Sequence, residues 1–209
     1  STQTKLRPEG LILTGSNHLP IVYDLLKAAD IPVAQCWGRE ETPIGISVGF
    51  DNQAAARDIV THLINRGRRR IAMLCAPRYF DNRLEQRIHG YEEAMKSHGL
   101  ETNLHDSIEG SSTYSGFHQS GKVLDDILQQ QPDTDAIFCS DDFNAVGALF
   151  RCQQRGIWVP NQLSIAGSQG IKVSVPGGDI DELFDRTVGK FDSGDDGGCR
   201  DHSPGGKPP

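Results

Sequence analysis

Apolar runs and helically spaced apolar residues alternate along most of the chain. Short apolar runs are typical of strands buried on both faces of a parallel sheet, and they fall at residues 10–14, 31–36, 44–50, 70–75, 136–139 and 163–166, with a weaker one at 105–109. Amphipathic spacing between these runs predicts helices over residues 19–29, 52–67, 81–99, 115–130 and 142–156. This alternation predicts an α/β fold with parallel sheets and right-handed crossovers.

The alternation breaks where two predicted strands, at residues 31–36 and 44–50, follow one another without a helix. We therefore expect a change of domain at residues 49–52, with Asp51 or Asn52 capping the next helix. This divides the chain into residues 1–50 and 51–167.

Residues 168–209 differ from the rest of the chain, because they are rich in glycine and aspartate and poor in apolar side chains. Such a composition cannot bury a core. We expect this stretch to be a divergent tail that is disordered or non-native.

The composition argues against several classes of protein. A net charge of −7 carries no basic signature for nucleic acid, and no apolar run is long enough to span a membrane. The five cysteines lack zinc or redox spacing, so we expect free thiols in a reducing cytoplasm, and no metal or cofactor. There is no nucleophile elbow, phosphate loop, dinucleotide fingerprint or metal-spaced histidine pair, which argues against an enzyme.

Candidate chemistry lies at the start of the helix that follows the strand at residues 70–75. Arg83 and Arg87 share one face of this helix, and the edge between a parallel strand and the next helix is where open α/β sheets bind ligands. A guanidinium placed there grips hydroxyls or a carboxylate with a fixed fork of donors. The alternative is a solvated basic helix start, and this stretch alone does not separate the two.

Several motifs resemble those of one known family in order and spacing. They are Val48-Gly49-Phe50-Asp51-Asn52, residues 62–72, Arg87-Ile88-His89-Gly90-Tyr91, Ser115-Gly116-Phe117, residues 136–142, Ala145-Val146-Gly147-Ala148, and residues 159–167. Together they resemble the effector-binding core of the lactose/galactose-repressor family of bacterial transcription regulators. The resemblance covers residues 9–167, and within the family it is nearest to gluconate-type repressors.

The resemblance implies a periplasmic-binding-protein-like fold with two parallel-sheet lobes, which hold a sugar or a sugar acid such as gluconate between them. The opening strands and helices of the first lobe are absent, so we expect residues 1–50 to form an incomplete first lobe and residues 51–167 the second lobe. Family members bind operator DNA as dimers through an amino-terminal helix-turn-helix domain. We expect that domain to be missing here and the cytoplasmic parent protein to be a homodimeric repressor of carbohydrate metabolism.

Three residues match positions of the family pattern most directly. Arg87 matches the arginine that grips the effector. Asp141 matches a position that offers a polar side chain to the effector, and Asp142 matches the neighbouring acid, for which we expect a helix-capping role.

Three further residues are weaker candidates for effector binding. Ser111 falls near the place where some members stack an aromatic ring on the ligand, and a serine there favours a hydroxyl-rich ligand. Trp37 either offers a stacking face or packs against neighbouring residues. Arg83 either adds charge for a carboxylate or lies on the surface, the surface role being slightly favoured.

A periplasmic-type sugar-binding protein of a transport system is the alternative, because it shares the fold and the cleft. The Asp51-Asn52 and Arg68-Arg69-Arg70-Ile71 patterns favour the regulator.

Overall fold

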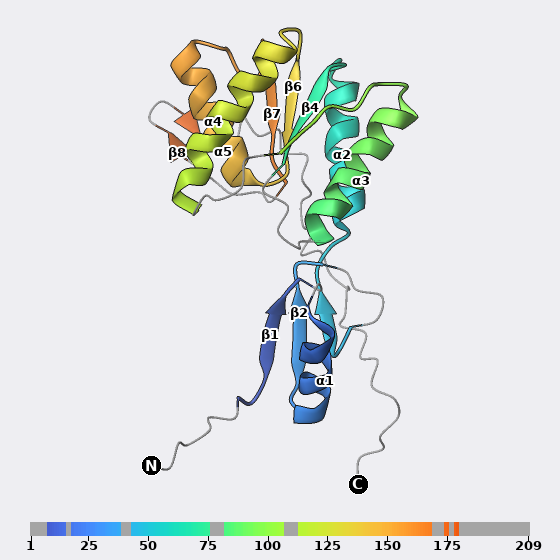
Figure 1. The fold of residues 1–209 in the computed structure, drawn as a ribbon. Helices are drawn as coiled ribbons and strands as arrows, with labels where there is room; N and C mark the ends of the chain where they lie inside the picture. The colour runs from blue at the N-terminus through green and yellow to red at the C-terminus, as the bar shows by residue number, and fades with distance from the viewer. Residues whose placement is uncertain are drawn as a thin grey trace.

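The computed structural model describes residues 8–15, 18–38, 43–75, 82–106, 113–168, 174–175 and 178–179. For residues 113–118 and those after 168 it describes the backbone only. Figure 1 shows two lobes, with the small first lobe below the larger second lobe.

The second lobe is built on a four-stranded parallel sheet of order β5-β4-β6-β7. Its strands are β4 (Ile71–Cys75), β5 (Leu104–Asp106), β6 (Ala136–Cys139) and β7 (Ser164–Ala166). Every residue of β4 and β6 is buried, which explains why these central strands are continuous apolar runs.

Two pairs of helices cover this sheet. α2 (Asn52–Asn65) and α3 (Asn82–Ser97) form one pair, and α4 (Thr113–Gln130) and α5 (Asp142–Arg155) form the other. Because strand side chains alternate between faces, Met73 packs with the α2–α3 cluster and Leu74 with the opposite cluster. The second lobe is therefore a three-layer α/β unit with a core on each face of its sheet.

The first lobe is smaller and more exposed. β1 (Leu11–Thr14), β2 (Val33–Cys36) and β3 (Ile46–Val48) pair in parallel in that order, and α1 (Pro20–Ala29) connects the first two. α1 contributes no fully buried residue, and the sheet residues Ile12 and Ile46 are exposed. Ile12 and Ile46 lie on either side of Ala34 on one face of the sheet, and among the described residues nothing covers that face.

The ends of the predicted elements differ from the observed ones by a few residues. The strand predicted over residues 44–50 is paired only at Ile46–Val48, opposite Ala34 to Cys36 of β2. The weakly patterned strand predicted over 105–109 is an edge strand, observed at Leu104–Asp106.

Little of the predicted tail lies within the described residues. There the structure describes a short antiparallel pair, β8 (Ser174–Val175) and β9 (Gly178–Asp179). The expectation for most of residues 168–209 thus falls outside the described part of the chain. Among the helices that the structure describes, none has the length and apolarity needed to cross a bilayer.

Gly90 allows α2 and α3 to approach closely. A Cβ atom at this position would lie 2.2 Å from the carbonyl oxygen of Gln53 and 2.9 Å from the backbone nitrogen of Arg57. Backbone atoms cannot move aside without separating the two helices, so any side chain at residue 90 strains this contact.

We therefore predict that Gly90→Ala lowers the free energy of unfolding by about 2 kcal/mol or more, measured by urea denaturation with circular dichroism. Gly121→Ala is the matched control, because the three atoms nearest to a Cβ there belong to the side chain of Arg151, at 3.3 Å or more, and not to a backbone. That change should alter stability by no more than about 1 kcal/mol. Equal stabilities for the two variants would contradict the close-approach explanation.

Candidate functional site

Arg87 is buried at the edge of the second sheet. It lies in the second turn of α3, and only 7% of its surface is exposed. Its Nε donates to Oδ1 of Asn52 at 3.0 Å, and its Nη1 donates to the carbonyl oxygen of Ser140 at 2.8 Å. Ser140 directly follows β6, so the guanidinium lies at the carboxyl end of the sheet, where open α/β sheets bind ligands. Partners on two elements fix the plane of the guanidinium fork.

Asn52 connects Arg87 to the first lobe. It is the first residue of α2 and its side chain is fully buried, with 0% of the residue exposed. While its Oδ1 accepts from Arg87, its Nδ2 donates to the carbonyl oxygen of Trp37 at 3.1 Å. The capping role falls to Asp51, whose Oδ1 accepts from the backbone nitrogen of Ala54. The sequence had suggested only a possible capping role for Asn52, because its real partners lie 15 and 35 residues away.

Trp37 lies where β2 ends, on the side of the first lobe that meets the second. Its φ of 73° is in the left-handed region, which is unusual for a bulky residue. Its backbone nitrogen donates to the carbonyl oxygen of Val48, and 57% of the residue is exposed. Beside it, Gly38 and Gly49 touch backbone to backbone, since a Cβ at Gly49 would lie 2.4 Å from the Gly38 oxygen. These contacts define the backbone where the two lobes join.

Asp141 caps α5 and directly follows Ser140, the residue whose carbonyl oxygen accepts from Arg87. Its Oδ1 accepts from the backbone nitrogen of Asn144 at 2.8 Å, and its Oδ2 accepts from Nδ2 of Asn144 at 2.7 Å. Asn144 is held in turn by the hydroxyl of Ser120 on α4. Burial raises the pKa of Asp141 above its usual value, against the opposing effects of the Asn144 backbone N–H and the positive charge of Arg87.

The expected capping role of Asp142 is wrong. The chain is extended at Asp141, with φ −148° and ψ 166°, and helical backbone begins only at the next residue. Asp142 is therefore the first helical residue, and it is buried. A Cβ atom added at Gly167 would lie only 2.2 Å from Oδ1 of Asp142. Two adjacent acids satisfy the same capping pattern, and only the backbone conformation decides which of them caps.

The end of β6 is fixed by hydrogen bonds from both directions. The carbonyl oxygen of Ser140 accepts from Arg87 and also from the hydroxyl of Ser168, at 2.7 Å. Arg87 donors and the Asp141 carboxylate thus border the carboxyl ends of the central strands. This combination suits a ligand that carries hydroxyls and a carboxylate. Among the described residues, no group of three or more His, Cys, Asp or Glu side chains is placed to hold a metal ion.

Two of the weaker candidates add little to this geometry. Arg83 is partly buried one turn before Arg87 on α3. Ser111 lies outside the described residues, so its expected place near the ligand is not part of the described site.

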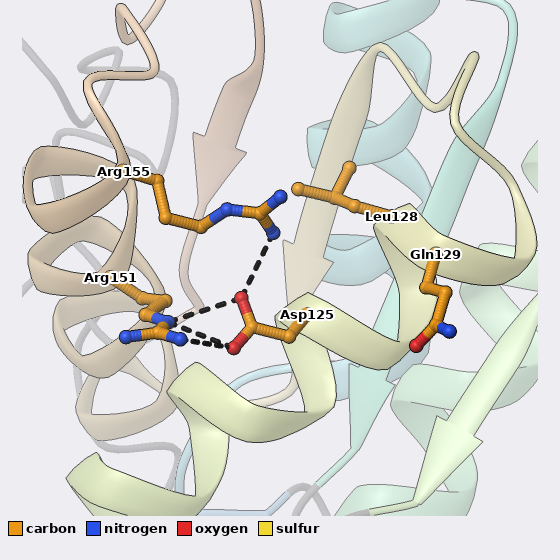
Figure 2. Close-up of a pocket in the computed structure, with 5 residues that line it drawn as sticks. All are labelled: Asp125, Leu128, Gln129, Arg151 and Arg155. Atoms are coloured by element: carbon orange, nitrogen blue, oxygen red, sulfur yellow. Dashed lines mark hydrogen bonds and ion pairs between the residues drawn. The ribbon is translucent and has the colours of Figure 1, made fainter.

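A separate depression of roughly 470 Å³ lies between α4 and α5 (Figure 2). Figure 2 shows both arginines directed at one carboxylate, since Arg151 and Arg155 pair with Asp125. The hydrogen bond from Arg151 holds the pKa of Asp125 below its usual range. The depression is lined by the carboxyl-terminal halves of α4 and α5, away from the carboxyl ends of the strands where open α/β sheets bind ligands, so it is a weaker candidate for a ligand site than the surroundings of Arg87.

Comparison with known families and structures supports the observed fold. A family model described as a periplasmic binding protein-like domain matches residues 60–177. The transcription regulator GntR from Chromobacterium violaceum has a similar structure, with a TM-score of 0.67, 36% sequence identity, and coverage of 77% of this chain and 58% of that one.

Curated relatives are transcription regulators by name. The chain is 39% identical over 163 residues to the HTH-type transcriptional regulator GntR of Escherichia coli K12, covering 78% of this chain and 47% of the relative. It is 36% identical over 166 residues to the HTH-type transcriptional regulator IdnR of the same organism, covering 79% and 48%. The chain thus spans about half the length of the curated relatives that it matches.

The raised pKa of Asp141 predicts a specific dependence of stability on pH. Between the ordinary carboxyl value of 3.8 and the raised one, the folded state binds more protons than the unfolded state. This group alone therefore makes the free energy of unfolding fall as pH rises through that window. Asp141→Asn removes the effect and still caps the helix, so stability should gain more, or lose less, from pH 4 to pH 7 than in the wild type.

Asp125→Asn is the control with the opposite sign. Because the pKa of Asp125 is lowered, its contribution to stability is present above the unfolded-state pKa and is lost as pH falls. The Asp125→Asn variant should therefore lose less stability than the wild type as the pH falls below about 4, and its profile between pH 4 and pH 7 should stay nearly parallel to that of the wild type. Urea denaturation at each pH measures both variants, and an Asp141→Asn profile parallel to that of the wild type would contradict the burial argument.

Proposed function

Because the chain belongs to the periplasmic binding protein-like domain family, we propose that it is the effector-sensing core of a bacterial transcription repressor of the lactose/galactose-repressor family. The observation that carries the proposal is Arg87, a buried arginine held in a fixed plane at the carboxyl end of the sheet. The names of the relatives favour a regulator over the sugar-binding component of a transport system.

The proposed effector is a sugar or sugar acid such as gluconate. Arg87 would bind the carboxylate of a sugar acid, and Asp141 would accept hydrogen bonds from its hydroxyls. Trp37 would offer an apolar ring face, and Arg83 and Ser111 are secondary candidates for polar contacts. In this proposal the ligand lies between the lobes formed by residues 1–50 and 51–167.

Regulation would require the longer, cytoplasmic parent protein. We propose that it is a homodimer whose separate helix-turn-helix domain contacts operator DNA. An effector changes DNA binding only if it binds the two arrangements of the lobes with different affinity. Within this chain the proposed role is ligand binding without catalysis.

Calorimetric titration of the chain with gluconate tests the proposal. Glucitol is a matched neutral ligand, because it carries a CH₂OH group where gluconate has its carboxylate. If Arg87 binds that carboxylate, gluconate should bind more tightly than glucitol by about 1.5–3 kcal/mol, which is about 10- to 150-fold in Kd. Arg87→Lys, which keeps the charge but loses the fork, should lose most of this preference.

Arg151→Ala is the control, because it removes an arginine from the α4–α5 depression and leaves Arg87 in place. Its Kd for gluconate should remain within about threefold of the wild-type value. Loss of binding in Arg151→Ala but not in Arg87→Lys would move the ligand to that depression. If the wild-type chain binds neither gluconate nor glucitol nor related sugar acids, the proposed function is contradicted.

A further inference from the structure

A continuous path of hydrogen bonds runs from Ser140 through Arg87 and Asn52 to Trp37. We infer that Asn52 is a positioning residue that orients Arg87 toward the effector. Through its second hydrogen bond it couples the orientation of the Arg87 guanidinium to the backbone of the first lobe at Trp37. The inference rests on the effector role proposed for Arg87. It adds a residue that holds this arginine and a physical route from the ligand to the junction between the lobes.

The chemistry of the Asn52 side chain explains why an amide is suited to this place. Its oxygen accepts from a charged donor on α3, and its nitrogen donates to a carbonyl oxygen of the first lobe. A buried amide is costly unless both of its ends are hydrogen-bonded, and this amide is completely buried. Aspartate would keep the acceptor, lose the donor and add a negative charge beside Arg87, whereas alanine would lose both the acceptor and the donor. The two substitutions therefore separate the two halves of the path.

The Trp37 end of the path is sensitive to its hydrogen bonds. A left-handed backbone is unfavourable for a side chain of this size and persists only when the surroundings enforce it. Two of the bonds that enforce it are the one from the Trp37 nitrogen to Val48 and the one from Asn52 to the Trp37 oxygen. Loss of the Asn52 bond removes one of these restraints, so the indole ring should change its position or mobility.

A single-tryptophan chain allows this end to be observed directly. The sequence has only two tryptophans, and Trp158 is exposed, so Trp158→Phe leaves Trp37 as the one indole emitter. Asn52→Asp, Asn52→Ala and the control Gln53→Ala are made in this background. Gln53 is the next residue on α2, and its side-chain amide donates a hydrogen bond to the exposed carboxylate of Glu93 on α3. Circular dichroism establishes that each variant is folded.

The first arm measures gluconate affinity by calorimetry together with Trp37 emission. In the Trp158→Phe background and in Gln53→Ala, gluconate should bind and shift the emission. The carboxylate of Asn52→Asp neutralises part of the Arg87 charge, so this variant should bind gluconate more weakly and keep the Kd for neutral glucitol within about threefold of the wild-type value. Asn52→Ala should weaken the binding of both ligands by about tenfold or more. At saturating ligand both variants should show a smaller emission shift than the Trp158→Phe background, because only direct contact between the ligand and Trp37 remains. If both Asn52 variants instead behave like Gln53→Ala in affinity and emission, the inference is overturned.

The second arm needs no ligand. Arg87→Ala should shift the emission of Trp37 when Asn52 is present and should cause no further shift when it is combined with Asn52→Ala. No shift at all, or the same shift in both backgrounds, would overturn the coupling through Asn52. If the wild-type chain fails to bind gluconate, the proposed function fails in the first arm, while this arm still decides whether the path exists.

Discussion

The constraint on which the site depends is the burial of one positive charge. A guanidinium taken out of water must be hydrogen-bonded in several directions, and Arg87 meets this requirement with partners from the start of α2 and the end of β6. Those elements are far apart in the sequence, so the arginine holds the second lobe together where its strands end. The same bonds fix the direction of the guanidinium fork, which suits Arg87 to the effector-binding role proposed for it.

The second lobe was predictable because its strands are buried on both faces. Side chains on the two faces of β4 and β6 meet different helix pairs, so these strands leave a continuous apolar signal. The edge strand β5 is only partly buried, and its pattern is correspondingly weak. In the first lobe the apolar pattern predicted α1, but α1 has no fully buried residue. Periodicity shows which face is apolar and does not show whether another segment covers it.

The candidate site was predictable only in part. The position of Arg87 after a buried strand and at a helix start was enough to place it at the sheet edge. The role of Asn52 was missed because its partners become neighbours only through folding. The assignment of the cap to Asp142 failed because the extended backbone at Asp141 is a tertiary consequence of where β6 ends. Such roles follow from the backbone geometry at element ends, which residue types alone do not specify.

The most direct test of the account is nitrogen-15 NMR of arginine Nε–H groups during a gluconate titration. The Arg87 Nε–H is buried and bonded to Asn52, so its proton should exchange slowly and give a resolved signal, assigned by its loss in Arg87→Lys. The account predicts that gluconate shifts this signal and leaves that of Arg151, which bonds to Asp125, in place. A shift of the Arg151 signal with no change at Arg87 would contradict it.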